Sequence, residues 1–384
     1  MRNSLLYFFI LITPLVARGQ SADSLHRASI VIDAHNDVLI TTIMEGGDIS
    51  RYVPKGHTDL PRLSEGGVDA QFFSVWCGDD YGKGRAFAYA NRQIDSLMRI
   101  INDHPDKIAL ATTSADIHRA VKNNRIAALI GVEGGHMIES NMDYLDSLYK
   151  RGARYLTLTW NNSTDWATSA TDENNPKANL KHKGLTEFGK RVIRRMNELG
   201  MMVDLAHVGR QTFFDAIETS SKPVIVSHSN AYSIAPVSRN LRDDQIQAVA
   251  KNGGVICVNF YSAFLDENYG NKRDKLYAST VPKKQQRDDL SGDGRFNALS
   301  TESKEKLRPP LSVLMDQIDY LVKVAGVDHV GLGGDFDGME STVQGLDDVS
   351  DYPNITSALI DRGYSDGDIR KILGANVLRV LEAQ

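Results

Sequence analysis

Eight short apolar runs, separated by longer stretches with helical periodicity, recur along this 384-residue chain. The runs are mostly β-branched and apolar at consecutive positions, which is typical of parallel strands buried on both faces. Strands that alternate with helices in this way predict an α/β fold, a (β/α)8 TIM barrel, with a doubly wound open sheet as the alternative. The predicted strands are Ile30–Ile32, Ala70–Val75, Ala127–Val132, Tyr155–Thr159, Met202–Leu205, Val224–Val226, Val255–Asn259 and His329–Leu332.

The stretches between these runs are predicted to be helices. Several of them stop at a glycine, the usual residue just past a helix C-terminus, as at Gly152, Gly200 and Gly326. The predicted helices are Ala86–Asp103, Asp143–Arg151, Thr186–Leu199, Gln211–Thr219, Asp243–Lys251 and Leu311–Ala325.

One polar segment interrupts the alternation. Leu265–Pro310 is long, rich in Lys, Asp and Glu, and follows the seventh predicted strand. In a barrel it would lie on the face where active sites are built, as a lid or a partner contact, with a floppy surface insertion as the alternative. We expect a single barrel domain over residues 20–384 with this insertion at about 265–310.

Residues 1–19 are typical of a secretory signal peptide, with Arg2, the apolar stretch Leu5–Val16, and small residues at Ala17 and Gly19. An uncleaved anchor is the alternative, but the stretch is too short for a comfortable membrane span. No cysteine follows to carry a lipid, and the C-terminal LRVLEAQ lacks the hydrophobic tail of a glycolipid anchor. We expect an exported protein, secreted or periplasmic, that is soluble after signal removal and has no transmembrane span in the mature chain.

Composition narrows the classes of function. A formal net charge of −5 without a basic block gives no reason to expect a nucleic-acid partner. Cys77 and Cys257 are the only cysteines, which excludes a disulfide scaffold and a cysteine-based zinc site. Both lie in or beside apolar runs, where a buried free thiol is commoner than a disulfide. Any metal must therefore be held by histidines and carboxylates.

Residue types that bind metals follow several of the apolar runs. The first run leads into His35 and Asp37, and side chains at i and i+2 share one face of an extended chain. The third run ends in Glu133, the fifth leads into His207, and the sixth into His228. In a barrel these strand ends meet at one mouth, so we expect the five groups to converge.

Imidazole nitrogens and carboxylate oxygens suit Zn²⁺, but five groups exceed the four ligands of one tetrahedral ion. If Glu133 bridges, His35 and Asp37 complete one site, and His207 and His228 complete another. Two ions about 3.5–4 Å apart can share a hydroxide and lower its pKa enough to make a nucleophile at neutral pH. The pattern therefore predicts two zinc ions per chain.

The eighth run leads into Asp335. A carboxylate above a metal-bound water is a good proton carrier, although this one could merely cap the following turn. Asp337, in the same D-F-D-G stretch, is interpreted as structural. The other histidines are interpreted as hydrogen-bonding or surface groups: His26, His57, His104, His118, His136, His182 and His329.

Taken together, these residues resemble the membrane (renal) dipeptidase family, zinc hydrolases related to the amidohydrolase barrels. The resemblance covers nearly all of the mature chain, in the order IVIDAHNDV, HTDLPRLSEGGVDAQFFSVW, IGVEGGH, YLTLTWNN, VDLAHV, VIVSHSNAYSIAPVSRNL, HVGLGGDFDG and GANVLRVL. It implies a (β/α)8 barrel in which His35 and Asp37 bind one zinc, Glu133 bridges, and His207 and His228 bind the second.

The resemblance also implies two roles near the metal ions. Asp335 matches the carboxylate that handles the proton during peptide cleavage. Arg239 matches an arginine that grips the terminal carboxylate of the substrate, a task suited to a planar, permanently charged guanidinium. A surface ion pair is the alternative for Arg239.

One departure from the family pattern concerns substrate binding. Better-known members have L-T-L-T-H after the fourth strand, with a histidine that helps to hold the substrate, whereas this chain has Trp160. Tryptophan offers one N–H donor, no acceptor, and much more bulk. We expect hydrolysis to persist with altered substrate choice and rate, and Asn161 or Asn162 is a candidate for the lost polar contact.

These features predict an exported dipeptidase with two zinc ions. In this hypothesis a bridging hydroxide attacks the peptide carbonyl, one zinc polarises its oxygen, and Asp335 passes a proton to the leaving amine. The family tendency suggests a homodimer. Two alternatives stay open: the same two-metal barrel acting on another amide, a lactone or a phosphoester, and a non-catalytic protein that keeps the metal as structural support.

Overall fold

The computed structural model describes residues 22–81, 84–287 and 292–384, so the predicted signal peptide at 1–19 lies outside the described residues. Eight parallel strands form a closed barrel, which confirms the predicted TIM barrel. The ring closes because β2 pairs with β4 along Ala70↔Ala127, while β1 pairs with β9. Around the ring the strands are β1 Ile32–Asn36, β2 Ala70–Val75, β4 Ile126–Glu133, β5 Ala153–Thr157, β6 Met202–Asp204, β7 Ile225–Val226, β8 Val255–Val258 and β9 Val330–Leu332.

Seven of the eight predicted strands lie within two residues of their expected bounds, whereas the first strand and one additional strand differ more from the expectation. The first strand spans Ile32–Asn36 rather than Ile30–Ile32, because its polar residues find buried partners: Asp33 Oδ1 accepts from the backbone N–H of Gly334 at 2.8 Å. The short strand β3, Ile108–Leu110, was not predicted. It pairs in parallel with the start of β4, and three residues are too few to show a strand periodicity.

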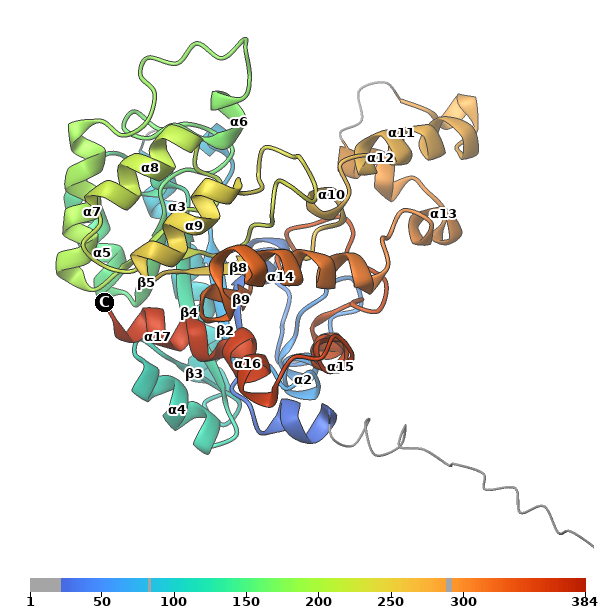
Figure 1. Ribbon diagram of the computed structural model, residues 1–384, viewed down its shortest axis with the longest axis horizontal. Coiled ribbons are helices and arrows are strands. Elements are labelled where there is room, and N and C mark those ends of the chain that lie inside the picture. Colours follow the sequence, from blue (N-terminus) through green and yellow to red (C-terminus); the bar gives the residue numbers. More distant parts are fainter. Residues whose placement is uncertain (1–21, 82–83, 288–291) are drawn as a thin grey trace, which may run out of the picture.

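Helices surround the barrel (Figure 1). Two match their predicted bounds, Ala86–Asp103 and Leu311–Ala325, because each has a continuous apolar face that packs on the strands. The α-helices are α2 Leu60–Glu65, α3 Ala86–Asp103, α4 Ser114–Lys122, α5 Met142–Lys150, α6 Ala170–Glu173, α7 Glu187–Leu199, α8 Arg210–Thr219, α9 Asp243–Asn252, α10 Ser262–Leu265, α11 Tyr269–Thr280, α12 Gly292–Asn297, α13 Thr301–Glu305, α14 Leu311–Ala325, α15 Tyr352–Asp361, α16 Asp366–Arg370 and α17 Asn376–Glu382.

The barrel interior is layered. An apolar cluster contains residues from several strands, among them Phe72, Tyr155, Met202 and Ile225. Two positions further along the same strands lie buried polar residues, namely Ser74, Thr157, Asp204 and Ser227. Because side chains two apart share a face, this polar layer stacks on the apolar one and forms the floor beneath the strand ends.

The polar segment Leu265–Pro310 is largely helical where the structure describes it. It contains α11, α12 and α13, which project to one side of the barrel in Figure 1. These helices share a small apolar cluster of their own that includes Tyr269, Tyr277 and Phe296. A packed cluster of this kind argues against the floppy surface insertion.

Cys77 and Cys257 are both buried, as expected, and no disulfide joins them to each other. Cys77 follows β2, whereas Cys257 lies within β8. Over the described ranges of the chain, no helix combines the length and the apolarity required to cross a membrane.

Candidate metal centre

The five predicted ligands come from four strand ends and meet at one mouth of the barrel. His35 lies in β1 with Asp37 just after it, and Glu133 is the last residue of β4. His207 and His228 follow β6 and β7. None of the five is more than 7% exposed. Five ionisable groups buried together are costly unless something charged compensates them.

Glu133 has the geometry of a bridging carboxylate. Its Oε2 lies 3.3 Å from His35 Nε2, which in turn is 3.7 Å from Asp37 Oδ2. Its other oxygen, Oε1, lies 2.8 Å from His207 Nε2 and 3.7 Å from His228 Nε2. In each of the two triads that share Glu133, the ligand atoms all lie within 4.8 Å of one another.

The donor atoms of these residues fit metal ions. His35 Nε2 and Asp37 Oδ1 are buried and have no hydrogen-bond partner among the described residues. The Nε2 atoms of His207 and His228 lie only 3.0 Å apart. Unpartnered nitrogens and carboxylate oxygens that face one point are the donor set that Zn²⁺ prefers.

The other ring nitrogen of each histidine contacts an oxygen. His35 Nδ1 is 2.9 Å from the Tyr155 hydroxyl, and His228 Nδ1 is 2.8 Å from Ser227 Oγ. The third, His207 Nδ1, is 3.0 Å from Asn161 Oδ1. An oxygen acceptor at Nδ1 places the proton there and leaves the Nε2 lone pair for a metal.

At the second triad, formed by Glu133, His207 and His228, electrostatics agrees with a set of metal ligands. Burial lowers the pKa of His207 to about 4, with a further contribution from the positive charge of Arg239. Burial likewise lowers the pKa of His228 well below its usual value. Burial alone would raise the pKa of Glu133, but the facing His35 and His207 hold it well below its usual value. The centre therefore offers a carboxylate and two neutral imidazoles at neutral pH.

Asp335 lies beside this centre. Its Oδ1 is 3.9 Å from His35 Nε2, and its Oδ2 accepts a hydrogen bond from Asn259 Nδ2 at 2.8 Å. Burial raises the pKa of Asp335 to about 7, and the nearby Asp37 carboxylate adds to the shift. A carboxyl group that exchanges its proton near neutral pH is suited to general acid–base catalysis.

The D-F-D-G stretch shapes the first triad as well. A Cβ atom at Gly338 would lie 1.9 Å from Asp37 Oδ2 and 2.8 Å from Asp335 Oδ1, so only glycine fits there. Asp337 Oδ1 accepts the backbone N–H of His57 at 2.8 Å, which ties this loop to a distant one. That contact agrees with a structural role for Asp337.

Arg239 is buried near the second triad rather than paired on the surface. It donates to Ser229 Oγ and to the carbonyl of His228, both at 3.3 Å, and its guanidinium lies 5.1 Å from the ring centre of Phe264. Burial lowers the pKa of Arg239 to about 10, so the group stays protonated at neutral pH. A buried cation at a cavity wall can bind an anionic group of a ligand.

Comparison with known proteins decides what kind of protein carries this centre. A family model for membrane dipeptidases (peptidase family M19) matches residues 19–384. The chain belongs to the membrane dipeptidase family. It is accordingly a hydrolase, a dipeptidase of the metallopeptidase type that depends on a metal cofactor, as the sequence resemblance implied.

Solved structures of similar proteins span the whole barrel. The probable dipeptidase PvdM from Pseudomonas aeruginosa is 25% identical, with 96% of this chain and 99% of that chain covered and a TM-score of 0.80. The metallopeptidase dipeptidase AC is 25% identical, with 92% and 98% covered and a TM-score of 0.75. A metallopeptidase from Rhodobacter sphaeroides, solved with a phosphinate mimic of the dipeptide L-Ala-D-Ala, is 24% identical, with 92% and 99% covered and a TM-score of 0.75.

The metal centre of this family member opens into a cavity of about 1020 Å³. Trp160 lies in its wall and stacks on Trp76, with ring centres 4.9 Å apart and planes at 26°. The ring of Trp160 is also 6.4 Å from that of His207. Trp160 therefore contributes an aromatic surface beside the second triad. Trp76, the other half of this surface, was not singled out from the sequence.

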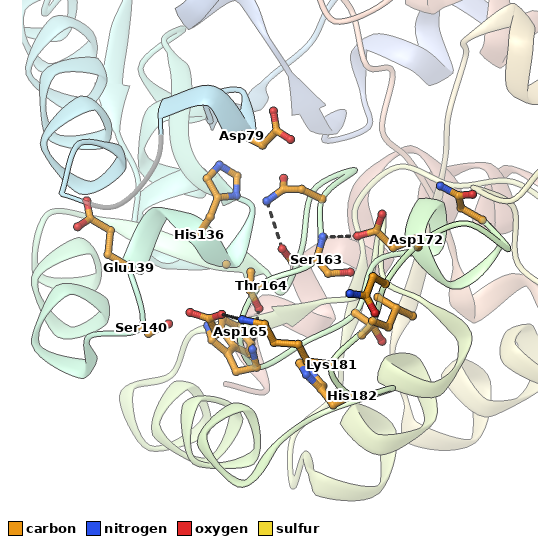
Figure 2. A pocket seen from close by; sticks show the side chains of 18 of the residues that line it. Asp79, His136, Glu139, Ser140, Ser163, Thr164, Asp165, Asp172, Lys181 and His182 are labelled. Carbon is orange, nitrogen blue, oxygen red and sulfur yellow. Dashed lines mark hydrogen bonds and ion pairs between the residues drawn. The ribbon is translucent and has the colours of Figure 1, made fainter.

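The two asparagines after Trp160 face different spaces. Asn161 lines the metal cavity, and its side-chain oxygen contacts His207. Asn162 lines a second hollow of about 460 Å³, shown in Figure 2, which contains none of the five ligands. His136 and His182 lie in this second hollow, which agrees with their assignment outside the metal site.

Proposed function

We propose that the protein hydrolyses dipeptides with two zinc ions, one held by His35, Asp37 and Glu133 and the other by Glu133, His207 and His228. The observation that carries this proposal is the placement of the two Glu133 oxygens, one toward His35 and the other toward His207 and His228. When bound, zinc supplies Lewis acidity, which polarises a carbonyl group and lowers the pKa of water.

The chain's own side chains supply the rest of the mechanism. Arg239 binds the terminal carboxylate of the dipeptide from the cavity wall. Asp335 takes up a proton at its carboxyl and passes it to the amine that leaves. Glu133 and the three histidines, whose Nδ1 atoms contact side-chain oxygens, keep the reacting groups in place. This converts the reaction into one between pre-positioned partners.

A dipeptide substrate is supported by the family and by one neighbour. The Rhodobacter sphaeroides metallopeptidase holds a phosphinate mimic of L-Ala-D-Ala. Arg239 and Asp335 lie on the walls of the same cavity in this chain, so a peptide held by its terminal carboxylate can present its scissile amide to Asp335. We expect the substrate to be a peptide of two residues rather than a longer one, as in the family.

The experiment is a panel of dipeptides incubated with purified protein, with and without a chelator, alongside metal analysis. We expect cleavage that disappears with the chelator and returns with Zn²⁺. A panel in which no dipeptide is cleaved by the zinc-loaded protein would refute the proposal.

Trp160 favours a second candidate function, hydrolysis of another amide, a lactone or a phosphoester at the same two metal ions. The ring of this side chain lies 6.4 Å from that of His207, where the sequence resemblance implies a smaller histidine in other members. A non-peptide substrate with a higher kcat/KM than every dipeptide would establish this alternative.

We also propose that residues 1–19 direct export and are removed, which leaves a secreted or periplasmic protein, and that the mature chain forms a homodimer. N-terminal sequencing of the protein recovered from the producing cells tests the first point, and a mature chain that retains Arg2 would contradict it. The mass of the purified protein in solution tests the second.

A further inference from the structure

Asp204, a buried carboxylate, lies beneath the second triad of ligands. It is the last residue of β6, is fully buried, and accepts four hydrogen bonds. Its Oδ1 accepts the backbone N–H groups of Ser227 at 2.9 Å and Ala206 at 3.1 Å. Its Oδ2 accepts the hydroxyl groups of Ser227 at 2.7 Å and Thr157 at 2.5 Å. The proposed mechanism uses none of these contacts.

The contact with Ser227 fixes the orientation of a metal ligand. A serine hydroxyl has a single hydrogen, and here it is donated to Asp204. The same oxygen lies 2.8 Å from His228 Nδ1, so it must accept a hydrogen bond from that nitrogen. The hydrogen bonds from His228 to Ser227 and from Ser227 to Asp204 therefore place the proton of His228 on Nδ1. They leave the lone pair on Nε2, the atom that faces Glu133.

The contact with Ala206 acts on the other histidine of the triad. The bond from the Ala206 N–H to Asp204 Oδ1 closes a tight turn at the end of β6. The next residue, His207, then adopts φ +63°, a left-handed conformation that is unfavourable for a side chain of this size. A turn held in this way can keep His207 in a conformation that it would not adopt by itself.

The first triad has separate support. His35 Nδ1 contacts the Tyr155 hydroxyl, which donates to the carbonyl of Ala34 at 3.1 Å. The backbone N–H of His35 donates to Asp33 at 3.2 Å. Neither Tyr155 nor Asp33 hydrogen-bonds to His207 or His228 in the described part of the chain, so the hydrogen bonds that support each triad can be removed separately.

We propose that Asp204 is the positioning residue of the second metal ion, because it holds His228 through Ser227 and His207 through the 204–207 turn. The inference rests on the proposed two-metal function. Loss of the Asp204 carboxylate should weaken the ion bound by Glu133, His207 and His228 and spare the ion bound by His35, Asp37 and Glu133.

The test is a titration of the complete mature protein, freed of metal, with Zn²⁺ alone. Calorimetry measures the affinities, and native mass spectrometry counts the bound ions. We expect two ions on the wild-type chain. In Asp204→Asn the second ion should bind about 10–100-fold more weakly, and the affinity for the first ion should not change. This is the usual effect of losing a residue that hydrogen-bonds to a metal ligand. Ser227→Ala should act in the same direction, and Ser227→Thr, which keeps the hydroxyl, should restore the affinity.

Asp33→Asn is the matched control, because it removes another fully buried carboxylate that contacts only the first side of the centre. It should leave the affinity of the second ion unchanged. Circular dichroism of the metal-free variants distinguishes weak metal binding from unfolding. If Asp204→Asn does not fold, Ser227→Ala tests the inference in its place. Wild-type affinity for the second ion in Ser227→Ala and Asp204→Asn would overturn the inference.

The two proposals fail in different ways. A wild-type chain that binds two ions but cleaves no dipeptide would refute the proposed function and leave the role of Asp204 intact. A wild-type chain that binds a single ion would overturn both. Normal dipeptide cleavage together with unaltered metal binding in the variants would refute only the role of Asp204.

Discussion

Asp335 has two properties that a proton carrier beside a metal centre requires. Burial raises its pKa to about 7, and its carboxyl lies 3.9 Å from His35 Nε2. The variant Asp335→Asn keeps the shape of the side chain but cannot exchange a proton. We expect kcat for dipeptides to fall by about 10²–10⁴-fold, the range that general acid–base catalysis contributes, with the zinc content unchanged. Steady-state kinetics and metal analysis on one preparation measure both.

The control for this prediction is Asp337→Asn, two residues further along. Its Oδ1 accepts a backbone N–H, a task that the amide oxygen of asparagine can also perform. This variant should lose far less activity than Asp335→Asn. Equal losses in the two variants would mean that the loop, and not the proton at Asp335, determines the rate.

Trp160 offers a stacking surface in the cavity into which the metal centre opens. An aromatic pair of this kind contributes about 0.5–1.5 kcal/mol beyond the area that it buries. We expect Trp160→Ala to lower kcat/KM for dipeptides that contain phenylalanine several-fold more than for alanyl dipeptides. The ratio of the two kcat/KM values measures the effect. An unchanged ratio would show that Trp160 contacts the protein and not the substrate.

The meeting of the five predicted ligands at one mouth could be predicted from the sequence because it follows from the order of the strands in a barrel. His35, Glu133 and His228 each lie at the end of an apolar run, and any closed barrel brings such ends together. The roles of Asn161 and Ser227 could not be predicted in this way. They depend on the rotation of one loop against another, which residue spacing does not record.

At the scale of elements, the carboxyl group of Asp69, just before β2, accepts a hydrogen bond from the backbone just before β1. Asp69 Oδ2 accepts the backbone N–H of Val31 at 2.9 Å, and burial raises the pKa of Asp69 from 3.8 to about 6. Between these two pH values the folded chain holds a proton that the unfolded chain has released. Stability therefore falls as the pH rises through this window, and the penalty is fully present above about 6.

The variant Asp69→Asn removes this penalty, because asparagine keeps the acceptor oxygen and does not ionise. We expect the free energy of unfolding of the variant, relative to wild type, to increase from pH 4 to pH 6 and to level off above. Urea unfolding at several pH values measures it. A difference that does not depend on pH would show that Asp69 titrates normally in the folded protein.

Sequence periodicity predicted the bounds of some helices and strands well and those of others poorly. The helices α3 and α14 were predicted with their observed bounds because a long apolar face leaves little choice of register. The strand β1 was placed too early because Asp33, His35 and Asn36 do not read as strand residues. Their buried hydrogen bonds, which lie in the tertiary structure, allow them to continue it.

At the scale of the whole molecule, the cavity into which the metal centre opens is built from segments far apart in the chain. Phe296 and Asn297 of the 265–310 segment line it together with Trp76, Trp160 and Arg239. The sequence placed the segment on the correct face of the barrel, because it follows β8, but did not show that its helices reach the cavity. That contact depends on how the segment folds on itself.

The metal centre also couples to the stability of the whole barrel. His35, Glu133, His207 and His228 come from strands in different parts of the ring, and their donor atoms face one another. Because an ion bound only by the folded chain stabilises it by RT ln(1 + [L]/Kd), Zn²⁺ at 100 times its Kd should add about 2.7 kcal/mol for each ion. We expect a chelator to lower the Tm, added Zn²⁺ to restore it, and Mg²⁺, which prefers oxygen ligands, to restore little. Thermal unfolding followed by circular dichroism measures this, and a Tm that is the same with chelator and with Zn²⁺ would contradict a metal ion that spans these strand ends.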